Sequence, residues 1–351
     1  MFSFKHLVVV LSLIGLDKVL AKEHGVTIGQ TFLAGSVDPT TGSAPWALTS
    51  HGVAEKLFTV DQNGEVVPQV AESIRKINEK EWEVTLKDDY WFSDGTAVTA
   101  QRVADALTEL NEKNPSASSS LGKITVTPKD DKTFTIESER PTFIMESVLA
   151  EWVFVVYMKS PNGDYLFTGP YEIESFGDQE IDLVPNRKYP IQPPEGHMRP
   201  EIHLRKFVDG HELAKAVENH TVDVGFNLPS DTLTDLRASD GVRVKSFKVG
   251  YHYMVFYNID SLPDIRVRQA MDLAINRTAL SQVLGGGYGT RSLFPDYSPF
   301  YSDDHADPHG DPDKAKELLD QAGWTLNEAT GKREKDGKEL VVNLVAYPQR
   351  K

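Results

Sequence analysis

The chain has 351 residues, which is long enough for at least two lobes at roughly 100–200 residues per domain. It contains no cysteine, so disulfides, thiolate metal sites and cysteine nucleophiles are all excluded. The formal net charge of −15 at pH 7 argues against binding to nucleic acid, because an acidic surface repels phosphate backbones.

The first 21 residues have the features of a secretory signal peptide. Lys5 and His6 precede an apolar run at residues 7–16, and Val19-Leu20-Ala21 places short side chains before a possible cleavage site. The apolar run is too short to cross a bilayer, which takes about 20 residues. We therefore expect residues 1–21 to be removed during export.

The stretch from Trp82 to Leu107 predicts a strand, a turn and a helix in succession. Apolar and polar residues alternate from Trp82 to Leu86, as in a strand with one face on a core. Residues 92–95, Phe-Ser-Asp-Gly, supply a turn, because Asp and Ser bond their own backbone and glycine tolerates positive φ. Thr99 is a candidate N-cap for the amphipathic helix that follows.

Other elements follow from the same kinds of pattern. Strands are predicted at residues 26–29, 124–127, 133–136, 202–207 and 340–347. Helices are predicted at residues 46–58, after Asp209, after Asp264 and after Asp311. We expect a polar loop at residues 116–120 and buried structure throughout the apolar residues 143–157. Strand–helix–strand units of this kind imply an α/β lobe with a mixed sheet.

Several motifs occur in an order that is typical of one family. W-x-V-x-L and F-S-D-G-T lie within residues 82–96, T-G-P-Y at residues 168–171, and D-I-R-V-R-Q-A at residues 264–270. The chain thus resembles the family 5 solute-binding proteins of bacterial ABC importers, which bind dipeptides, oligopeptides or nickel complexes. The resemblance implies an α/β, two-lobe periplasmic binding protein of the class II-like, Venus flytrap kind, with an extra subdomain in the first lobe.

The resemblance also implies a division of the chain. Lobe I would comprise residues 22–50 and 165–252, its accessory subdomain residues 51–164, and a partial lobe II residues 253–351. Residues 253–258 resemble the strand in which the family crosses into its second lobe. Members of the family continue beyond the position of Lys351, so the second lobe is expected to be incomplete and the chain to be C-terminally truncated.

Ligand contacts follow from the same resemblance. The family binds its solute in the cleft between the lobes, with the end of the first strand, the following helix and the apolar region before T-G-P-Y. In this chain the corresponding residues are Thr31, Phe32, Trp46, His51 and Trp152. Aromatic walls suit a peptide or a chelated metal, because they bury area at low entropic cost. Aromatic residues in apolar runs also commonly belong to the core.

No catalytic motif and no cofactor site is predicted. Residues 285–289, Gly-Gly-Gly-Tyr-Gly, lack the Lys-Ser/Thr of a phosphate loop and are interpreted as a connector. Residues 302–313 hold His305, His309 and several carboxylates, but Pro308 and Gly310 prevent a helix from aligning the imidazoles. We interpret this segment as a solvated loop; the alternative is a Zn²⁺ or Ni²⁺ site.

The expected function is that of a periplasmic, monomeric, non-enzymatic receptor. It would bind a small peptide or a nickel chelate between its lobes and deliver it to the transmembrane subunits of an ABC permease. Two alternatives remain open: a periplasmic peptide chaperone or scaffold without a transport role, and a non-functional truncated product. A hydrolase has no motif to support it.

Overall fold

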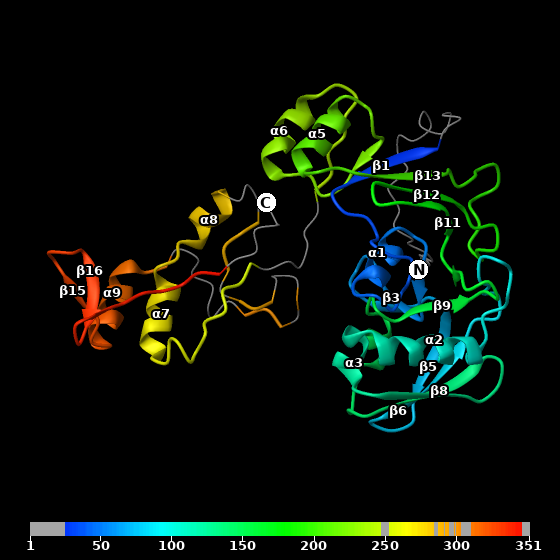
Figure 1. Ribbon diagram of the computed structural model, residues 1–351, viewed down its shortest axis with the longest axis horizontal. Helices are drawn as coiled ribbons and strands as arrows, with labels where there is room; N and C mark the ends of the chain where they lie inside the picture. The colour runs from blue at the N-terminus through cyan, green and yellow to red at the C-terminus, as the bar shows by residue number, and fades with distance from the viewer. Residues whose placement is uncertain are drawn as a thin grey trace, which may run out of the picture. The chain divides into compact units, whose positions relative to one another are not determined.

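The computed structural model describes residues 25–246, 253–283, 287–290, 292–294, 298, 300–302 and 310–345. The expected signal peptide lies outside these residues. No helix within them has the length and apolar character that crossing a membrane requires. The chain forms two compact units, Met1–Pro229 (unit 1) and Ser230–Lys351 (unit 2) (Figure 1). The domain boundary predicted after residue 252 falls beside residues that the structure does not describe, and it stays a prediction.

Unit 1 contains a mixed five-stranded sheet, as the sequence predicts. Its strands, in spatial order, are β11 (Tyr171–Phe176), β12 (Glu180–Pro185), β13 (Ile202–Lys206), β1 (Val26–Gln30) and β14 (Val224–Gly225). Strand β1 is parallel to both of its neighbours, β13 and β14, whereas β12 is antiparallel to its two neighbours, β11 and β13. The chain's first strand therefore lies inside the sheet, between two strands from much later in the sequence.

Helix α5 (Gly210–Glu218) connects β13 to β14 and covers one face of this sheet. Asp209 caps the helix as predicted, because its carboxylate accepts hydrogen bonds from the backbone N–H groups of His211 and Glu212. A Cβ atom added to Gly29 would lie 2.2 Å from a methyl group of Leu213, so glycine is required where the helix meets β1. The opposite face of the sheet packs on the main hydrophobic core.

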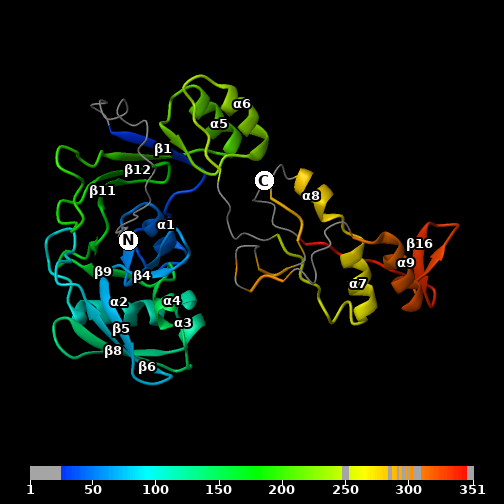
Figure 2. The same ribbon diagram turned by 180° about the vertical axis from the view of Figure 1, so that it is seen from behind.

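A second, antiparallel sheet has the order β5 (Ala71–Lys76), β6 (Glu81–Leu86), β8 (Thr133–Ser138) and β7 (Ile124–Pro128). Trp82, Val84 and Leu86 of β6 are buried, and the residues between them are less buried, which confirms the predicted alternation. Helix α2 (Ala100–Lys113) lies between this sheet and β9 (Val155–Lys159) (Figures 1 and 2). Thr99 caps α2 by accepting a hydrogen bond from Arg102 N, as predicted.

The turn before α2 also agrees with the prediction. Gly95 has a φ of +88°, and its N–H donates to the carbonyl of Phe92 at 2.9 Å. Asp94 accepts a hydrogen bond from Thr96 N at 2.7 Å, so its carboxylate holds the turn. The Phe92 ring is fully buried in the main core. This motif is therefore structural in unit 1.

The remaining elements of unit 1 correct three predictions. They are α1 (Ala44–Ser50), β2 (Glu55–Lys56), β3 (Phe58–Val60), β4 (Val66–Pro68), α3 (Pro115–Leu121), α4 (Met145–Leu149) and β10 (Tyr165–Phe167). The helix predicted at residues 46–58 ends at Ser50, because Gly52 takes a φ of +75° and β2 then pairs with β9. Residues 116–120, predicted as a polar loop, belong to helix α3. Asn114 caps this helix, Pro115 is its first residue, and its last residue, Leu121, is buried in the core. Phe143 begins the apolar run but is 69 % exposed.

The glycine of T-G-P-Y joins two segments that are distant in the sequence. Gly169 N donates to Val53 O at 2.9 Å, and Asn186 Nδ2 donates to Gly169 O at 2.8 Å. A Cβ atom at Gly169 would lie 2.4 Å from Val53 O and 2.5 Å from Gly52 O. Backbone oxygens cannot move aside as a flexible side chain can, so this position excludes every side chain.

Replacing Gly169 with alanine is expected to lower the free energy of unfolding by roughly 1–3 kcal/mol, the usual cost of overpacking. Gly35→Ala is the matched control, because a Cβ atom there meets nothing within 4 Å. Urea denaturation followed by circular dichroism measures both values. Equal stability of the two variants would show that the segment around Val53 yields to the added methyl group.

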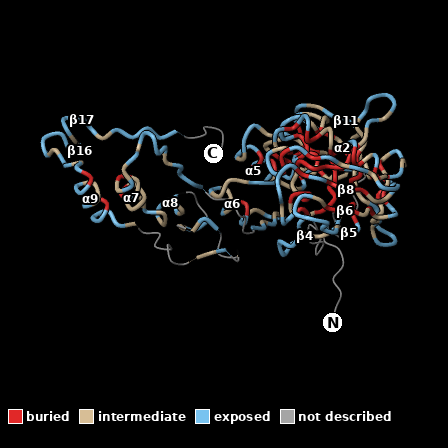
Figure 3. Tube along the Cα trace, turned by 90° about the horizontal axis from the view of Figure 1, so that it is seen from below, coloured by how far each residue is buried: buried red, intermediate tan, exposed pale blue. Residues whose placement is uncertain are grey.

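Unit 2 is built from short elements. They are a 3₁₀ turn (Ser230–Thr232), α6 (Leu233–Ala238), α7 (Ile265–Leu273), α8 (Arg277–Val283), α9 (Pro312–Gln321), β15 (Thr325–Asn327), β16 (Lys332–Lys335) and β17 (Lys338–Glu339). Helices α7 and α9 pack on each other, and Asp264 and Asp311 cap them as predicted. Few of the residues described in this unit are buried, whereas unit 1 has a dense core (Figure 3).

Two strands predicted in unit 2 are absent from the residues that the structure describes there. Residues 253–258 and 340–345 have no regular structure, and Phe256 and Val345 are 85 % and 92 % exposed. Their apolar patterns are those of strands, but a strand exists only when another strand pairs with it. Among the described residues neither run belongs to a sheet, and the second run has one ladder-like contact, from Leu340 N to Arg333 O of β16 at 2.8 Å.

Candidate functional site

Three of the five predicted ligand-contact residues meet in unit 1. The ring centroids of Phe32 and Trp46 lie 4.8 Å apart, and those of Phe32 and His51 lie 6.4 Å apart with an interplanar angle of 15°. Phe32 follows the carboxyl end of β1, whereas Trp46 and His51 come from α1 and its C-terminal end. We refer to Phe32, Trp46 and His51 as the aromatic shelf.

The three rings differ in exposure. Trp46 is 38 % exposed, Phe32 is partly buried, and His51 is buried at 7 % exposure. An exposed indole packed on a second ring is a surface that a solute can cover, since aromatic side chains bury much area and lose few rotamers. A solute can therefore reach the shelf at Trp46, whereas the ring of His51 is buried.

Local sequence explains how the shelf is held. Pro45 lies in the first turn of α1, where its missing N–H is not needed, and Ala47 and Leu48 anchor the helix in the main core. His51 is the C-cap residue, and its backbone N–H donates to Ala47 O at 2.9 Å. The rings of Trp46 and His51 are thus fixed to a helix that the core itself positions.

Burial controls the charge of His51. Desolvation lowers the pKa of its imidazole to about 4, so the ring is neutral at pH 7. Its Nε2 accepts a hydrogen bond from Ala34 N at 3.2 Å. His51 therefore contributes a neutral, oriented ring to the shelf.

The other two predicted residues are placed differently. Trp152 is partly buried against the main core and, among the described residues, makes no ring contact with the shelf. Thr31 lies between β1 and Phe32 and is partly exposed. A ligand contact by Thr31 or Trp152 stays a prediction.

Sequence reasoning missed a buried carboxyl group next to α1. Glu55 is 3 % exposed, and its Oε1 accepts hydrogen bonds from Tyr189 Oη at 2.8 Å and Gln69 Nε2 at 3.0 Å. Burial raises the pKa of Glu55 to about 7, although these hydrogen bonds oppose the shift. The residues around Glu55 in the sequence give no sign that its carboxyl group will be buried.

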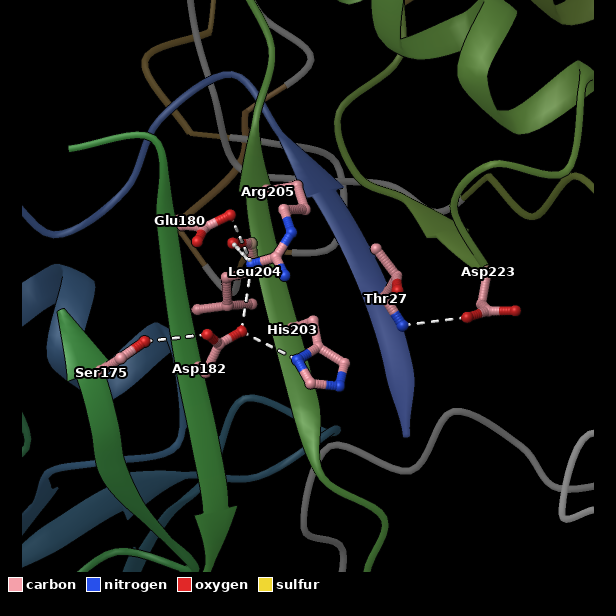
Figure 4. Close-up of polar contacts among 8 residues, drawn as sticks. All are labelled: Thr27, Ser175, Glu180, Asp182, His203, Leu204, Arg205 and Asp223. Atoms are coloured by element: carbon pink, nitrogen blue, oxygen red, sulfur yellow. Dashed lines mark hydrogen bonds and ion pairs between the residues drawn. The ribbon is translucent and has the colours of Figure 1, made fainter. Parts of the chain in front are cut away.

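A second polar cluster lies on the sheet face that carries α5 (Figure 4). Asp182 accepts hydrogen bonds from Ser175 Oγ and from His203 Nδ1, both at 2.8 Å, and from an Arg205 guanidinium nitrogen at 3.0 Å. In a hydrolytic triad the histidine bridges serine and aspartate, whereas here the aspartate bridges the other two. This arrangement does not activate the serine, and we interpret the cluster as cross-strand stabilisation.

The metal alternative gains no support from the part of the chain that the structure describes. No group of three or more His, Asp or Glu side chains able to hold a metal ion occurs in those residues. Residues 303–309, which include both histidines of the candidate loop, lie outside them. Of the glycine-rich segment, the described residues 287–289 have no regular structure.

Two surface cavities are described in addition to the shelf. One, of about 490 Å³, lies in unit 2 between α7 and α9, with Tyr257, Arg268 and Asp272 among its lining residues. The other, of about 390 Å³, lies in unit 1 beside the Gly95 turn and is lined by Trp91, Arg187, Lys188 and Tyr189 among others. Neither includes a predicted ligand-contact residue.

Comparison with known proteins gives a consistent picture. The family model for bacterial extracellular solute-binding proteins, family 5 (middle), matches residues 65–351. The nickel-binding protein NikA of Staphylococcus aureus is 24 % identical over 284 residues, covering 78 % of this chain and 56 % of that protein. The oligopeptide-binding protein OppA of Lactococcus lactis is 28 % identical over 196 residues, covering 50 % of this chain and 32 % of OppA.

Solved structures agree on the fold. The crystal structure of Staphylococcus aureus NikA with Ni(L-His)₂ has a TM-score of 0.69 at 22 % identity, covering 86 % of this chain and 64 % of NikA. The oligopeptide-binding protein AppA of Bacillus subtilis, in complex with a nonapeptide, has a TM-score of 0.66 at 19 % identity and coverages of 91 % and 68 %. The chain spans a little over half the length of NikA and about a third of the length of OppA.

Proposed function

Since the chain belongs to the bacterial extracellular solute-binding proteins of family 5, we propose that it is the receptor of an ABC importer. In this role it binds a small solute outside the cytoplasm and delivers it to a membrane permease. Members of this family are binding receptors and not enzymes, and the α/β, two-lobe fold of the solved relatives matches this chain.

The observation that carries the proposal is the aromatic shelf. Its exposed indole and the ring of Phe32 offer an apolar surface at the carboxyl end of β1, the edge at which open α/β sheets bind ligands. The solute classes to test are peptides and nickel chelates, which the relatives' names and structures supply. Both have flat groups that can stack on aromatic rings.

Replacing Trp46 with alanine is expected to weaken solute binding about tenfold, because the loss of a stacked ring contact removes on the order of 1.4 kcal/mol. The melting temperature should change little, since Trp46 is already 38 % exposed. Isothermal titration with a tryptic digest of casein, and separately with Ni²⁺ and two equivalents of L-histidine, measures the binding.

Phe143→Ala is the control, because it removes an exposed ring from unit 1 outside the shelf. Binding of either solute by the wild-type chain, reduced in the Trp46 variant alone, supports the proposal. A folded wild-type chain that binds neither solute would refute it.

A further inference from the structure

The cavity beside the Gly95 turn of unit 1 shares no residue with the aromatic shelf. Its volume is about 390 Å³, and its lining includes Arg187 and Lys188 from the segment after β12 and Trp91 from the turn before α2. Pockets that bind small molecules measure roughly 300–1,000 Å³, so this cavity has room for one. We refer to it as the basic pocket.

A buried asparagine holds the segment that carries the two cations. Asn186 is 1 % exposed, its Nδ2 donates to Gly169 O at 2.8 Å, and its Oδ1 accepts from Lys188 N at 2.8 Å. The second contact is an Asx turn, in which a side-chain oxygen bends the chain two residues further on. Neighbours in a straight strand point to opposite faces, whereas here Arg187 and Lys188 line one cavity. Lys188 lies across the turn, since a Cβ atom at Gly95 would be 3.3 Å from Lys188 Cε.

Neither cation forms an ion pair with a residue in the described part of the chain. The side chains of Arg187 and Lys188 also make no hydrogen bond there. The carboxylate of Asp94, in the adjacent turn, already accepts from Thr96 N at 2.7 Å and from Thr96 Oγ1 at 2.8 Å. Burial raises the pKa of Glu172, although the charge of Arg187 opposes that shift. The two cations are therefore available to an anion from solution.

Tyr189 and Trp91 give the basic pocket fixed aromatic walls. Tyr189 is 4 % exposed, and its Oη donates to the buried Glu55 carboxyl group at 2.8 Å. Trp91 is partly buried, and its backbone forms a β-bridge with Ala97. The Arg199 guanidinium lies 5.0 Å from the centroid of the Tyr189 ring and adds positive charge there. A flat ring can cover such walls at low entropic cost, because aromatic side chains have few rotamers to lose.

The number of charges favours a phosphoryl group over a carboxylate. A phosphate monoester carries a charge of roughly −1.5 to −2 at pH 7 and has three acceptor oxygens, so it can bind two cations at once. The net charge of −15 repels anions at long range, but salt screens exposed charges beyond about 8 Å at physiological ionic strength. Local charge therefore decides which ligand binds.

We propose that the basic pocket is a second binding site, which takes a small phosphate monoester that carries a flat ring. Arg187 and Lys188 bind the phosphoryl oxygens, and the ring rests against Trp91 and Tyr189. This site is separate from the solute site at the shelf and goes beyond the proposed receptor function.

The first test titrates the wild-type chain with phenyl phosphate. Indole N–H signals of ¹⁵N-tryptophan-labelled protein report binding, and the Trp91→Phe variant assigns the signal of Trp91. We expect that signal to shift in a saturable way. Benzyl alcohol has the ring without the charge, and inorganic phosphate has the charge without the ring, so both should bind more weakly. Equal affinity for either control would overturn the proposal.

The second test removes the two charges one at a time. Arg187→Gln and Lys188→Gln are each expected to raise the Kd for phenyl phosphate roughly tenfold, the value of one hydrogen bond to a charged group. Both side chains are exposed, so the melting temperature should change little. Arg75→Gln, at an exposed arginine of β5, is the control and should bind as the wild type does. An unchanged Kd in both pocket variants would refute the site.

The outcomes separate this inference from the proposed function. Trp46→Ala alters the shelf and should leave the binding of phenyl phosphate unchanged. Loss of phenyl phosphate binding in that variant would place the probe at the shelf and overturn the second site. A wild-type chain that binds peptide or nickel–histidine but no phenyl phosphate would refute the second site and leave the receptor function standing.

Discussion

Replacing Phe92 with alanine is expected to lower the free energy of unfolding by roughly 3–5 kcal/mol, the usual cost of deleting a buried aromatic ring. Phe92 has no exposed surface, and it belongs to the main hydrophobic core of unit 1. The turn that carries it is hydrogen-bonded at both ends, with Phe92 N donating to Thr96 O at 2.9 Å. The surrounding structure therefore has little freedom to collapse into the cavity.

Phe143→Ala provides the matched control. The same ring is removed from the same unit, but Phe143 is 69 % exposed and its recorded contact is Lys76 Nζ at 4.6 Å from the ring centroid. Losing an exposed cation–π contact costs about 0.5–1 kcal/mol. Denaturant unfolding monitored by circular dichroism gives both values, and similar losses in the two variants would contradict the placement of Phe92 in the core.

Replacing Glu55 with glutamine is expected to change how stability depends on pH. The pKa of Glu55 is about 7 in the folded chain, against 4.5 for an unperturbed carboxyl group, so between these values the folded chain binds more protons than the unfolded chain. The free energy of unfolding therefore falls as pH rises from 4.5 to 7, by about 3 kcal/mol from this group. Glutamine cannot titrate, so the variant should gain this amount relative to wild type over the same range.

His51 has the opposite effect in an overlapping window. Its pKa is lowered from 6.5 to about 4, so the unfolded chain binds more protons there and stability is lost as pH falls from 6.5 to 4. The two slopes largely cancel in the wild-type protein. Unfolding measured from pH 4 to 7.5 should show a steeper rise with pH in Glu55→Gln and a fall with pH in His51→Phe. If each variant differed from wild type by a constant amount at every pH, neither group would have the stated pKa.

The elements that the sequence predicted best are helices with a capping side chain at the N-terminus. Helices α2, α5, α7 and α9 each begin at a Thr or Asp whose side chain accepts from the first turn, and each was predicted from that residue. Helix α1 was predicted too long because the pattern of apolar residues continues into β2. The helix ends at Ser50 because Gly52 takes a positive φ and β2 then pairs with β9, about a hundred residues away.

Only part of the candidate site could be predicted from the sequence, because residue type can be read from the sequence and burial cannot. Residue type points to Phe32, Trp46 and His51, and the structure brings their rings together. The burial of Glu55 depends on tertiary packing, which no local pattern contains. The orientation of the His51 ring likewise depends on one backbone contact, the hydrogen bond that Ala34 N donates to Nε2.

The position of β1 inside the five-stranded sheet has a consequence for the order of folding. Val26 pairs with Ile202 and Ile28 pairs with Val224, so β1 has no strand neighbour until residues 202–225 have left the ribosome. All four strands of the sheet β5–β6–β8–β7 come from residues 71–138. Contacts between residues close in sequence form faster than distant ones, because less chain entropy is lost in closing the loop. A nascent chain can therefore form the sheet of β5, β6, β8 and β7 early, whereas the aromatic shelf, which depends on β1, is completed only after residues 202–225 have been made.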